Sequence, residues 1–179
     1  MSLCKASVFI ASSLDGFIAR PNGDLDWLPS ANERDDMGYG DFISSVDVLL
    51  MGRHTFEKVL EFGDWPYALP VRVLSRRGVE IPEPLQDKVS VMCGEPGDLL
   101  ATLGEQGFSH AYVDGGETIQ AFIAEDLIQR LIVTHVPVLI GSGLRLFGEL
   151  KDPQCTVPWR HQKTFTWPNG MVQSHYVRQ

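Results

Sequence analysis

The chain has 179 residues, of which 44% are hydrophobic and 21% are charged, and its formal net charge is −8. This composition excludes a disordered chain and can fill one hydrophobic core, so we expect a single domain over residues 1–179. The acidic balance repels phosphate backbones and excludes nucleic acid as the main partner, which leaves a small-molecule ligand.

The three cysteines, Cys4, Cys93 and Cys155, lie far apart in the sequence and match neither a metal-ligand spacing nor a CxxC pattern. No apolar run approaches the ~20 residues that a membrane span needs, and the N-terminus carries no secretory signal pattern. We therefore expect reduced thiols, no metal site, no membrane contact and a cytoplasmic location.

Short apolar runs between turn signals predict buried strands, and segments with start and stop signals predict helices. The expected strands, in chain order, are 8–11, 46–51, 71–75, 89–92, 111–114 and 131–140, the last with a bend at Pro137. The expected helices are 31–45, 55–60, 96–106 and 118–125. A terminal hairpin is expected from 156–167 and 171–177, around the turn formers Pro168, Asn169 and Gly170.

Strands that alternate with helices predict a mostly parallel sheet covered on both faces, and the hairpin adds antiparallel strands at one edge. The predicted fold class is therefore α/β. Its predicted architecture is a three-layer α/β/α sandwich with a mixed, mostly parallel sheet and a C-terminal antiparallel hairpin.

Three segments lie where an expected strand ends and the next loop or helix begins, and we call them strand-end junctions. The first follows the expected strand 46–51, consists of Gly52, Arg53, His54 and Thr55, and is suited to an anion. A glycine turn into a helix directs free N–H groups outward, and Arg53 adds a planar fork that matches phosphate. By spacing alone, this segment also fits a tight turn with a solvated arginine.

Two more junctions follow expected strands. Ser75, Arg76 and Arg77 place two arginines where they could clamp the 2′-phosphate of NADPH, although such pairs in loops are usually solvated. Gly115, Gly116, Glu117 and Thr118 form a common turn type that also lets the backbone approach a diphosphate. Because ligands of open α/β sheets bind beyond the carboxyl ends of the strands, the three junctions together predict a dinucleotide phosphate site.

These residues carry a family resemblance that spans about Val8 to Tyr176. Residues 51–57 resemble the cofactor-phosphate motif of dihydrofolate reductases, residues 74–76 the next adenosine-side motif, and Gly115-Gly116 the paired glycines under the diphosphate. Residues 13–16 and 138–143 resemble more closely the reductase domain of the bifunctional riboflavin-pathway deaminase-reductase. The resemblance implies a dihydrofolate-reductase-like fold and NADPH as the cofactor.

The resemblance also implies roles for single residues. It implies that the main chain of Ala11 and Ile18 holds the nicotinamide carboxamide, and that Trp27 belongs to a loop, 24–29, that closes over the site. Counting back from Gly52 without gaps puts Asp36 at the place of the family's catalytic carboxylate, with Tyr39 as a second polar group or a core residue. The acidic alternatives are Glu33, Asp35 and Asp41, or a merely solvated acidic helix start.

The predicted function is that of an NADPH-dependent oxidoreductase that transfers a hydride to a pterin- or pyrimidine-like heterocycle. One form of it is an activity like that of 5-amino-6-(5-phosphoribosylamino)uracil reductase. However, residues 58–67 lack the acidic-proline segment and the arginine that the riboflavin-type reductases carry for their substrate. The alternative is a non-catalytic nucleotide-binding protein that retains the fold. An exposed edge strand or the terminal hairpin predicts a homodimer.

Overall fold

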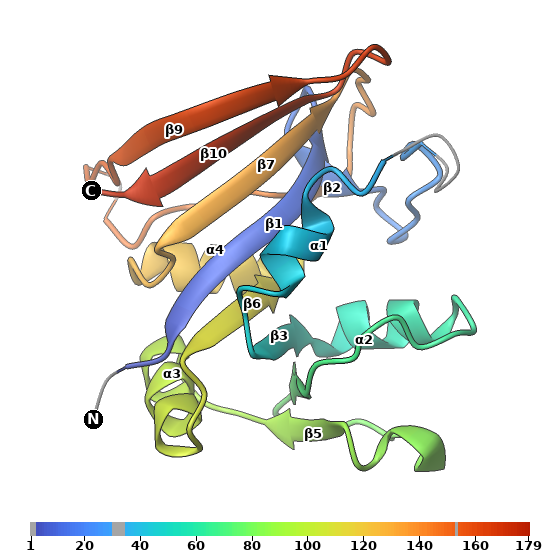
Figure 1. Cartoon of the computed structure of the whole chain (residues 1–179), viewed down its shortest axis with the longest axis vertical. Coiled ribbons are helices and arrows are strands. Elements are labelled where there is room, and N and C mark those ends of the chain that lie inside the picture. The colour runs from blue at the N-terminus through green and yellow to red at the C-terminus, as the bar shows by residue number, and fades with distance from the viewer. Residues whose placement is uncertain (1–2, 30–34, 153) are drawn as a thin grey trace.

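The computed structural model describes residues 3–29, 35–152 and 154–179. The strands of its main sheet are β1 (Lys5–Ser13), β3 (Val48–Gly52), β4 (Val71–Leu74), β5 (Val89–Met92), β6 (His110–Asp114), β7 (Arg130–Val136), β9 (Trp159–Thr166) and β10 (Val172–Arg178). They form one eight-stranded sheet in the order β5-β4-β3-β6-β1-β7-β10-β9 (Figure 1). The strands from β5 to β7 are mutually parallel, and β10 and β9 follow in antiparallel pairings.

Helices cover both faces of this sheet. They are α1 (Tyr39–Ile43), α2 (Arg53–Leu60), α3 (Pro96–Glu105) and α4 (Gly116–Ala124), with a 3₁₀ turn, η2 (Glu83–Leu85), before β5. In β3, Val48 and Leu50 pack with the α3 and α4 side chains, whereas Leu49 and Met51 pack with those of α1 and α2. Because alternate side chains of a strand point to opposite faces, β3 is covered on both sides. Figure 1 shows α1 in front of the sheet and α4 behind it. The predicted three-layer α/β fold is confirmed.

Two predicted elements are wrong at their ends for identifiable backbone reasons. The helix expected at 31–45 is only the five-residue α1 in the described chain, because Met37 (φ 52°) and Gly38 (φ 81°) adopt the left-handed conformation and stop it. Residues 30–34, which include Glu33, lie outside the described residues. The strand expected at 131–140 ends at Val136, because Pro137 has no N–H group to extend the pairing.

Other boundaries differ in ways that matter for the site. Helices α2 and α4 each begin two residues earlier than expected, directly after a glycine. A second, two-stranded sheet of β2 (Phe17–Ala19) and β8 (Leu144–Arg145) was not expected, because strands this short carry no readable alternation. Within the described ranges, no helix is both long and apolar enough to cross a membrane.

The segment after β7 is fastened to the start of the chain. The Leu14 N–H donates to the Val138 carbonyl (2.9 Å), and the Asp15 carboxylate accepts the N–H groups of Ile140 (3.3 Å) and Gly141 (2.7 Å). Further on, Gly143 passes so close to β2 that a Cβ atom there would overlap the Ala19 carbonyl oxygen. These contacts bring together the two segments, 13–16 and 138–143, on which part of the family resemblance depends.

The close approach at Gly143 predicts a large difference between two neighbouring glycines. We expect Gly143→Ala to lower the free energy of unfolding by more than about 2 kcal/mol, because the backbone of β2 must shift. Gly141→Ala is the control, since apart from its chain neighbours no atom of the described residues lies within 4 Å of its Cβ position, and only its φ of +78° opposes a side chain, at about 1–2 kcal/mol. Urea unfolding measures both, and equal losses would contradict the steric explanation.

Candidate active site

Two glycine turns lie against each other at the carboxyl ends of the adjacent parallel strands β3 and β6. A Cβ atom on Gly52 would lie 3.0 Å from Thr118 Oγ1, and one on Gly115 would lie 2.5 Å from Thr55 Oγ1. Gly115 also has a φ of +96°, which side-chain-bearing residues rarely adopt. Each glycine therefore makes room for the threonine of the other turn, and α2 and α4 begin next to each other.

The two helix N-termini form a set of donors suited to a diphosphate. Neither Gly52 before α2 nor Gly115 before α4 supplies a side-chain cap, so the first N–H groups of both helices lack such a partner. The Arg53 side chain at the start of α2 is 36% exposed, and its Nε lies 3.8 Å from Glu57. Uncapped helix starts attract anions, and an arginine adds charge and planar hydrogen bonding. These residues fit the phosphates of a dinucleotide.

The loop with the paired arginines follows β4, the other neighbour of β3, where Leu74 is in register with Gly52. Ser75 Oγ donates to the Gly78 carbonyl (2.8 Å) and accepts the Arg77 N–H (3.3 Å), so this hydroxyl closes the turn. Arg76 and Arg77 are exposed and form no ion pair with any described residue. The loop after β4 thus presents the side chains of Arg76 and Arg77, without an ion-pair partner among the described residues, one strand away from the start of α2.

The main chain of β1 is open toward β6 beyond residue 7. In the described sheet, β1 pairs with β6 only over residues 5–7, whereas it pairs with β7 up to Ser13. The Lys5 N–H and the Phe9 carbonyl both bond on the β6 side, the latter to the Tyr112 hydroxyl (3.0 Å). Along a strand, the main-chain N–H and carbonyl groups of every second residue point to the same side. Ala11 lies two residues after Phe9, so its N–H and carbonyl also point toward the β6 side, where β1 has no paired strand.

The Ile18 side chain of β2 packs against the second glycine turn. A Cβ atom on Gly116 would lie 3.0 Å from Ile18 Cδ1 and 3.3 Å from the Arg145 carbonyl oxygen. The exposed guanidinium of Arg145 lies over the Phe17 ring, 4.9 Å from its centre. The Arg145 main chain thus lies at the start of α4, a contact that sequence reasoning missed because Arg145 belongs to β8 and follows no predicted strand.

Asp114, the last residue of β6, is the second residue that sequence reasoning missed. Burial raises the pKa of its carboxyl to about 6, although Oδ1 accepts the Gly115 N–H (2.8 Å). Tyr39 lies close by, and burial together with the Asp114 charge raises the pKa of its phenol to about 12. The same causes raise the pKa of Tyr67. A carboxyl that ends a buried strand directly before paired glycines was the available signal.

Asp36 occupies a different environment. Its two carboxylate oxygens accept the N–H groups of Gly38 (2.9 Å) and Gly40 (3.0 Å) at the start of α1, and these bonds lower the pKa of Asp36. An exposed carboxylate with a lowered pKa holds no proton at neutral pH. The contacts give Asp36 a structural role at α1, and the proton-donor role stays a prediction for which Asp114 is better placed.

The other candidate residues from this part of the sequence, Asp35, Tyr39 and Asp41, make contacts in different parts of the structure. Asp35 accepts a hydrogen bond from Trp167 Nε1 (2.8 Å), and Asp41 lies exposed in the first turn of α1. Tyr39 packs edge-on against Phe9, with 5.5 Å between the ring centres, so it serves the aromatic core while its phenol lies near Asp114. Of the predicted catalytic residues, Tyr39 alone has this proximity to the buried carboxyl among the described contacts.

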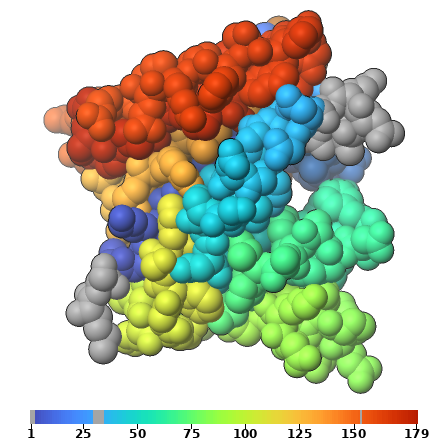
Figure 2. Space-filling model, viewed as in Figure 1, coloured from blue at the N-terminus to red at the C-terminus, as the bar shows by residue number. Residues whose placement is uncertain are grey.

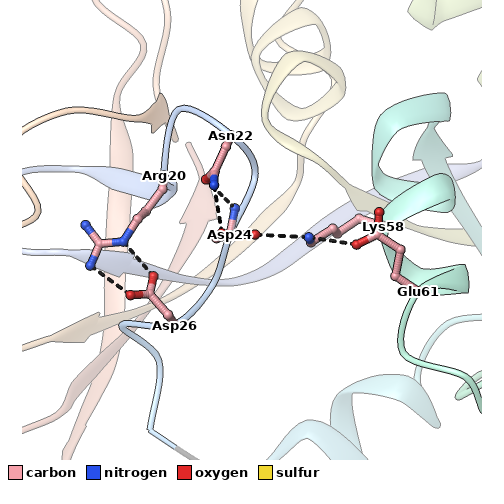
Figure 3. Close-up of polar contacts among 6 residues, drawn as sticks. All are labelled: Arg20, Asn22, Asp24, Asp26, Lys58 and Glu61. Carbon is pink, nitrogen blue, oxygen red and sulfur yellow. Dashed lines mark hydrogen bonds and ion pairs between the residues drawn. The ribbon is translucent and has the colours of Figure 1, made fainter.

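One ion pair, between Asp24 and Lys58, fastens to α2 the loop that carries Trp27, and Figure 3 shows this pair. Arg20 and Asp26 form a two-pronged pair within the loop (2.6 and 3.1 Å). Lys58 of α2 donates to Asp24 Oδ1 (3.1 Å) and to Glu61 Oε2 (2.8 Å). The indole N–H of Trp27 is buried and has no hydrogen-bond partner among the described residues. The helix that begins at Arg53 therefore also holds the loop predicted to cover the site.

The buried carboxyl predicts a pH-dependent stability difference. Because the folded state raises the Asp114 pKa from 3.8 to about 6, the folded protein binds this proton more tightly, and stability is lost as the pH rises through that interval. We expect the free energy of unfolding of Asp114→Asn, relative to that of the wild type, to rise by up to about 3 kcal/mol between pH 4 and pH 8. Urea unfolding at both pH values measures the difference, and a pH-independent difference would contradict it.

The Lys58 contact predicts how firmly the loop is held. We expect Lys58→Met to speed hydrogen exchange of the loop amides, such as that of Leu28, by a factor of about two to five, the range for one exposed ion pair. Glu61→Gln is the matched control, since it removes the negative charge that competes for Lys58 and leaves Asp24 with its lysine. Faster exchange in both variants would indicate a general loosening of α2 instead.

Comparison with known proteins agrees with this architecture. A family model described as the RibD C-terminal domain matches residues 5–173. The uncharacterized protein YwjB of Bacillus subtilis (strain 168) is 34% identical, over 97% of this chain and 98% of its own length. A crystal structure of a putative riboflavin biosynthesis protein from Shewanella sp. PV-4 is 41% identical and superimposes with a TM-score of 0.89, over 98% of this chain and 99% of that one.

A more distant structure shows the same fold within a longer protein. It is a diaminohydroxyphosphoribosylaminopyrimidine deaminase/5-amino-6-(5-phosphoribosylamino)uracil reductase from Thermotoga maritima, 17% identical, with a TM-score of 0.73. The match covers 99% of this chain and 57% of that protein. The family model matches nearly the whole length, and the Shewanella structure superimposes over nearly all of it: this chain belongs to the RibD C-terminal domain family.

Proposed function

We propose that this protein is an NADPH-dependent reductase that acts on a small heterocycle at the carboxyl ends of β1, β3 and β6. The observation that carries the proposal is the meeting of two uncapped helix N-termini, with Arg53 at one of them and Arg76 and Arg77 one strand away. A family of reductase-like domains supports the same reading.

The proposed cofactor contacts follow from the donors present. The N–H groups at the starts of α2 and α4, with the hydroxyls of Thr55 and Thr118, would bind the diphosphate. Arg53, Arg76 and Arg77 would bind the 2′-phosphate, which NADH lacks. The open main chain of Ala11 would hydrogen-bond the nicotinamide carboxamide, beside Ile18.

The bound cofactor supplies a hydride, and the protein positions the acceptor and provides a proton. Hydride addition to a C=N bond leaves a nitrogen that must be protonated. With its pKa raised to about 6, the partly buried Asp114 carboxyl could hold that proton. Tyr39 and Tyr67 would offer phenols to the polar edge of a ring, and Trp27 with its loop would exclude water.

The proposed substrate class is a pyrimidine-like or pterin-like heterocycle. A carboxyl with two tyrosines packed against the same face of the sheet could bind the adjacent nitrogen and oxygen atoms at the edge of such a ring. The Thermotoga relative, named as a reductase of an aminopyrimidine, supports the pyrimidine form. The absence of the acidic-proline segment from residues 58–67 favours a substrate that differs from that of the riboflavin-pathway enzyme at its sugar phosphate.

The competing function is a nucleotide-binding protein without turnover. The departures in residues 58–67 favour it, and Asp114 argues against it, because a protein that only binds nucleotide has no evident use for a buried, protonatable carboxyl at this place. The two functions differ in whether NADPH is consumed when pyrimidines and pterins are added, which absorbance at 340 nm measures.

Calorimetric titration with NADPH and NADH tests the cofactor site. We expect NADPH to bind at least tenfold more tightly than NADH, a difference of about 1.4 kcal/mol. We expect Arg53→Ala to weaken NADPH binding by about 1–3 kcal/mol, the range for a charged hydrogen bond, and to affect NADH less. Arg160→Ala, on β9, is the matched control. Unchanged NADPH affinity in Arg53→Ala would overturn the assignment of the phosphate site.

A further inference from the structure

Two segments near Asp114 each contribute one tyrosine to the proposed substrate site. Tyr39 belongs to residues 35–43, which end in α1, and Tyr67 belongs to residues 57–69, which run from α2 toward β4. Burial together with the charge of Asp114 raises the pKa of both phenols, so both segments lie close to that carboxyl. Figure 2 shows them, in cyan and in blue-green, on one face of the molecule.

The loop 20–29 belongs with these two segments, and we call residues 20–29, 35–43 and 57–69 together the rim. The ion pair of Asp24 and Lys58 (3.1 Å) joins the loop to α2. In the proposed function the starts of α2 and α4 take the cofactor phosphates. A substituent on a ring bound at Asp114 therefore has to leave the site along the rim.

The rim is strongly acidic, because it contains eight carboxylates and only two cations. Both cations are paired with carboxylates of the rim itself. Arg20 pairs with Asp26 (2.6 Å), and Lys58 pairs with Asp24 and with Glu61 (2.8 Å). Residues 30–34, outside the described part of the chain, add one acidic and one basic residue to the sequence and leave this balance unchanged.

The backbone of the rim offers an anion no better place. The helix that begins within the rim is α1, and a helix start attracts anions through its free N–H groups. There the Asp36 carboxylate already accepts the N–H groups of Gly38 (2.9 Å) and Gly40 (3.0 Å). A phosphate would find this position taken by a negative charge of the protein.

Charge is thus divided between the two halves of the site. Arg53 begins α2, and Arg76 and Arg77 follow β4, so the cations assigned to the cofactor all lie outside the rim. Proteins bind phosphates with arginine forks, lysines or free helix starts, and the described rim has none of these unoccupied. The site can therefore attract the phosphates of a dinucleotide while it repels a phosphate on the second ligand.

We propose that the substrate is a heterocycle without a phosphate group, either a free base or its nucleoside. This inference rests on the proposed reductase function and narrows its substrate class. A nucleotide would bring a phosphate of nearly two negative charges to a rim whose described cations are already paired. An uncharged ribose, or no substituent at all, meets no such repulsion.

NADPH consumption at 340 nm tests the proposal with a matched pair of probes. They are 5-amino-6-(5-phosphoribosylamino)uracil, the compound in the name of the Thermotoga relative, and the same compound without its phosphate. We expect kcat/KM to be at least tenfold higher for the phosphate-free compound. The ratio should fall as salt is added, because dissolved ions screen the repulsion. Any other pyrimidine or pterin nucleoside that is reduced is compared with its 5′-phosphate in the same way.

A charge reversal assigns the preference to the rim. We expect Asp64→Lys to lower the ratio at least threefold by raising kcat/KM for the phosphorylated compound. Asp64 is exposed and forms no ion pair with a described residue, so the change leaves the contacts of the rim intact. Glu105→Lys, an equal charge change at an exposed position of α3 on the opposite face of the sheet, is the matched control and should leave the ratio unchanged. Circular dichroism melting verifies that both variants are folded.

The outcomes distinguish this inference from the function on which it rests. A phosphorylated compound that is reduced as well as its phosphate-free partner would overturn the inference and leave the reductase activity established. A ratio that Asp64→Lys changes no more than Glu105→Lys does would have the same meaning. If no pyrimidine or pterin, with or without phosphate, causes NADPH consumption, the proposed function is overturned and this inference with it.

Discussion

The pairing of β3 with β6 is the constraint on which the site depends. Leu49, Leu50 and Met51 stand in parallel register with Tyr112, Val113 and Asp114, so both strands reach the sheet edge together. The two glycine turns come from chain segments about sixty residues apart, and only this register sets them side by side. A slip of one residue would exchange the faces of either strand and separate the two helix starts.

The same packing that sets the register also determines the chemistry of the sheet edge. Leu49 and Met51 belong to the core under α1 and α2, and that core includes Tyr112 and the partly buried Tyr39 and Tyr67. Asp114 emerges beside this apolar and aromatic surface, which removes water from its carboxyl and raises its pKa. The raised pKa thus arises mainly from core packing, which takes water away from the carboxyl.

Much of this architecture could be predicted from the sequence. The strand at 89–92 matched to the residue, and Gly52, Arg53, Gly115 and Gly116 were recognised as ligand-binding candidates because glycine turns after buried strands have a strong local signature. Site roles inferred from the resemblance, such as those of Ala11, Ile18 and Trp27, stay predictions that the geometry permits.

What could not be predicted depended on contacts between distant segments or on backbone conformation. Asp36 was chosen by counting back from Gly52, and no count reveals that its carboxylate would bind the N–H groups of Gly38 and Gly40. The left-handed backbone at Met37 is set by tertiary context, because methionine has no local preference for it. The contact of the Arg145 carbonyl with Gly116 depends on β8, a strand too short for its sequence to indicate.

The sharing of Lys58 between Asp24 and Glu61 has a consequence for ionic strength. All three side chains are substantially exposed, so dissolved ions screen their attraction, which reaches only about 8 Å in physiological salt. The loop that carries Trp27 is therefore held by a fastening that weakens as salt concentration rises, while the sheet and its buried core are scarcely affected. A high salt concentration would loosen this loop before it disturbed the fold beneath.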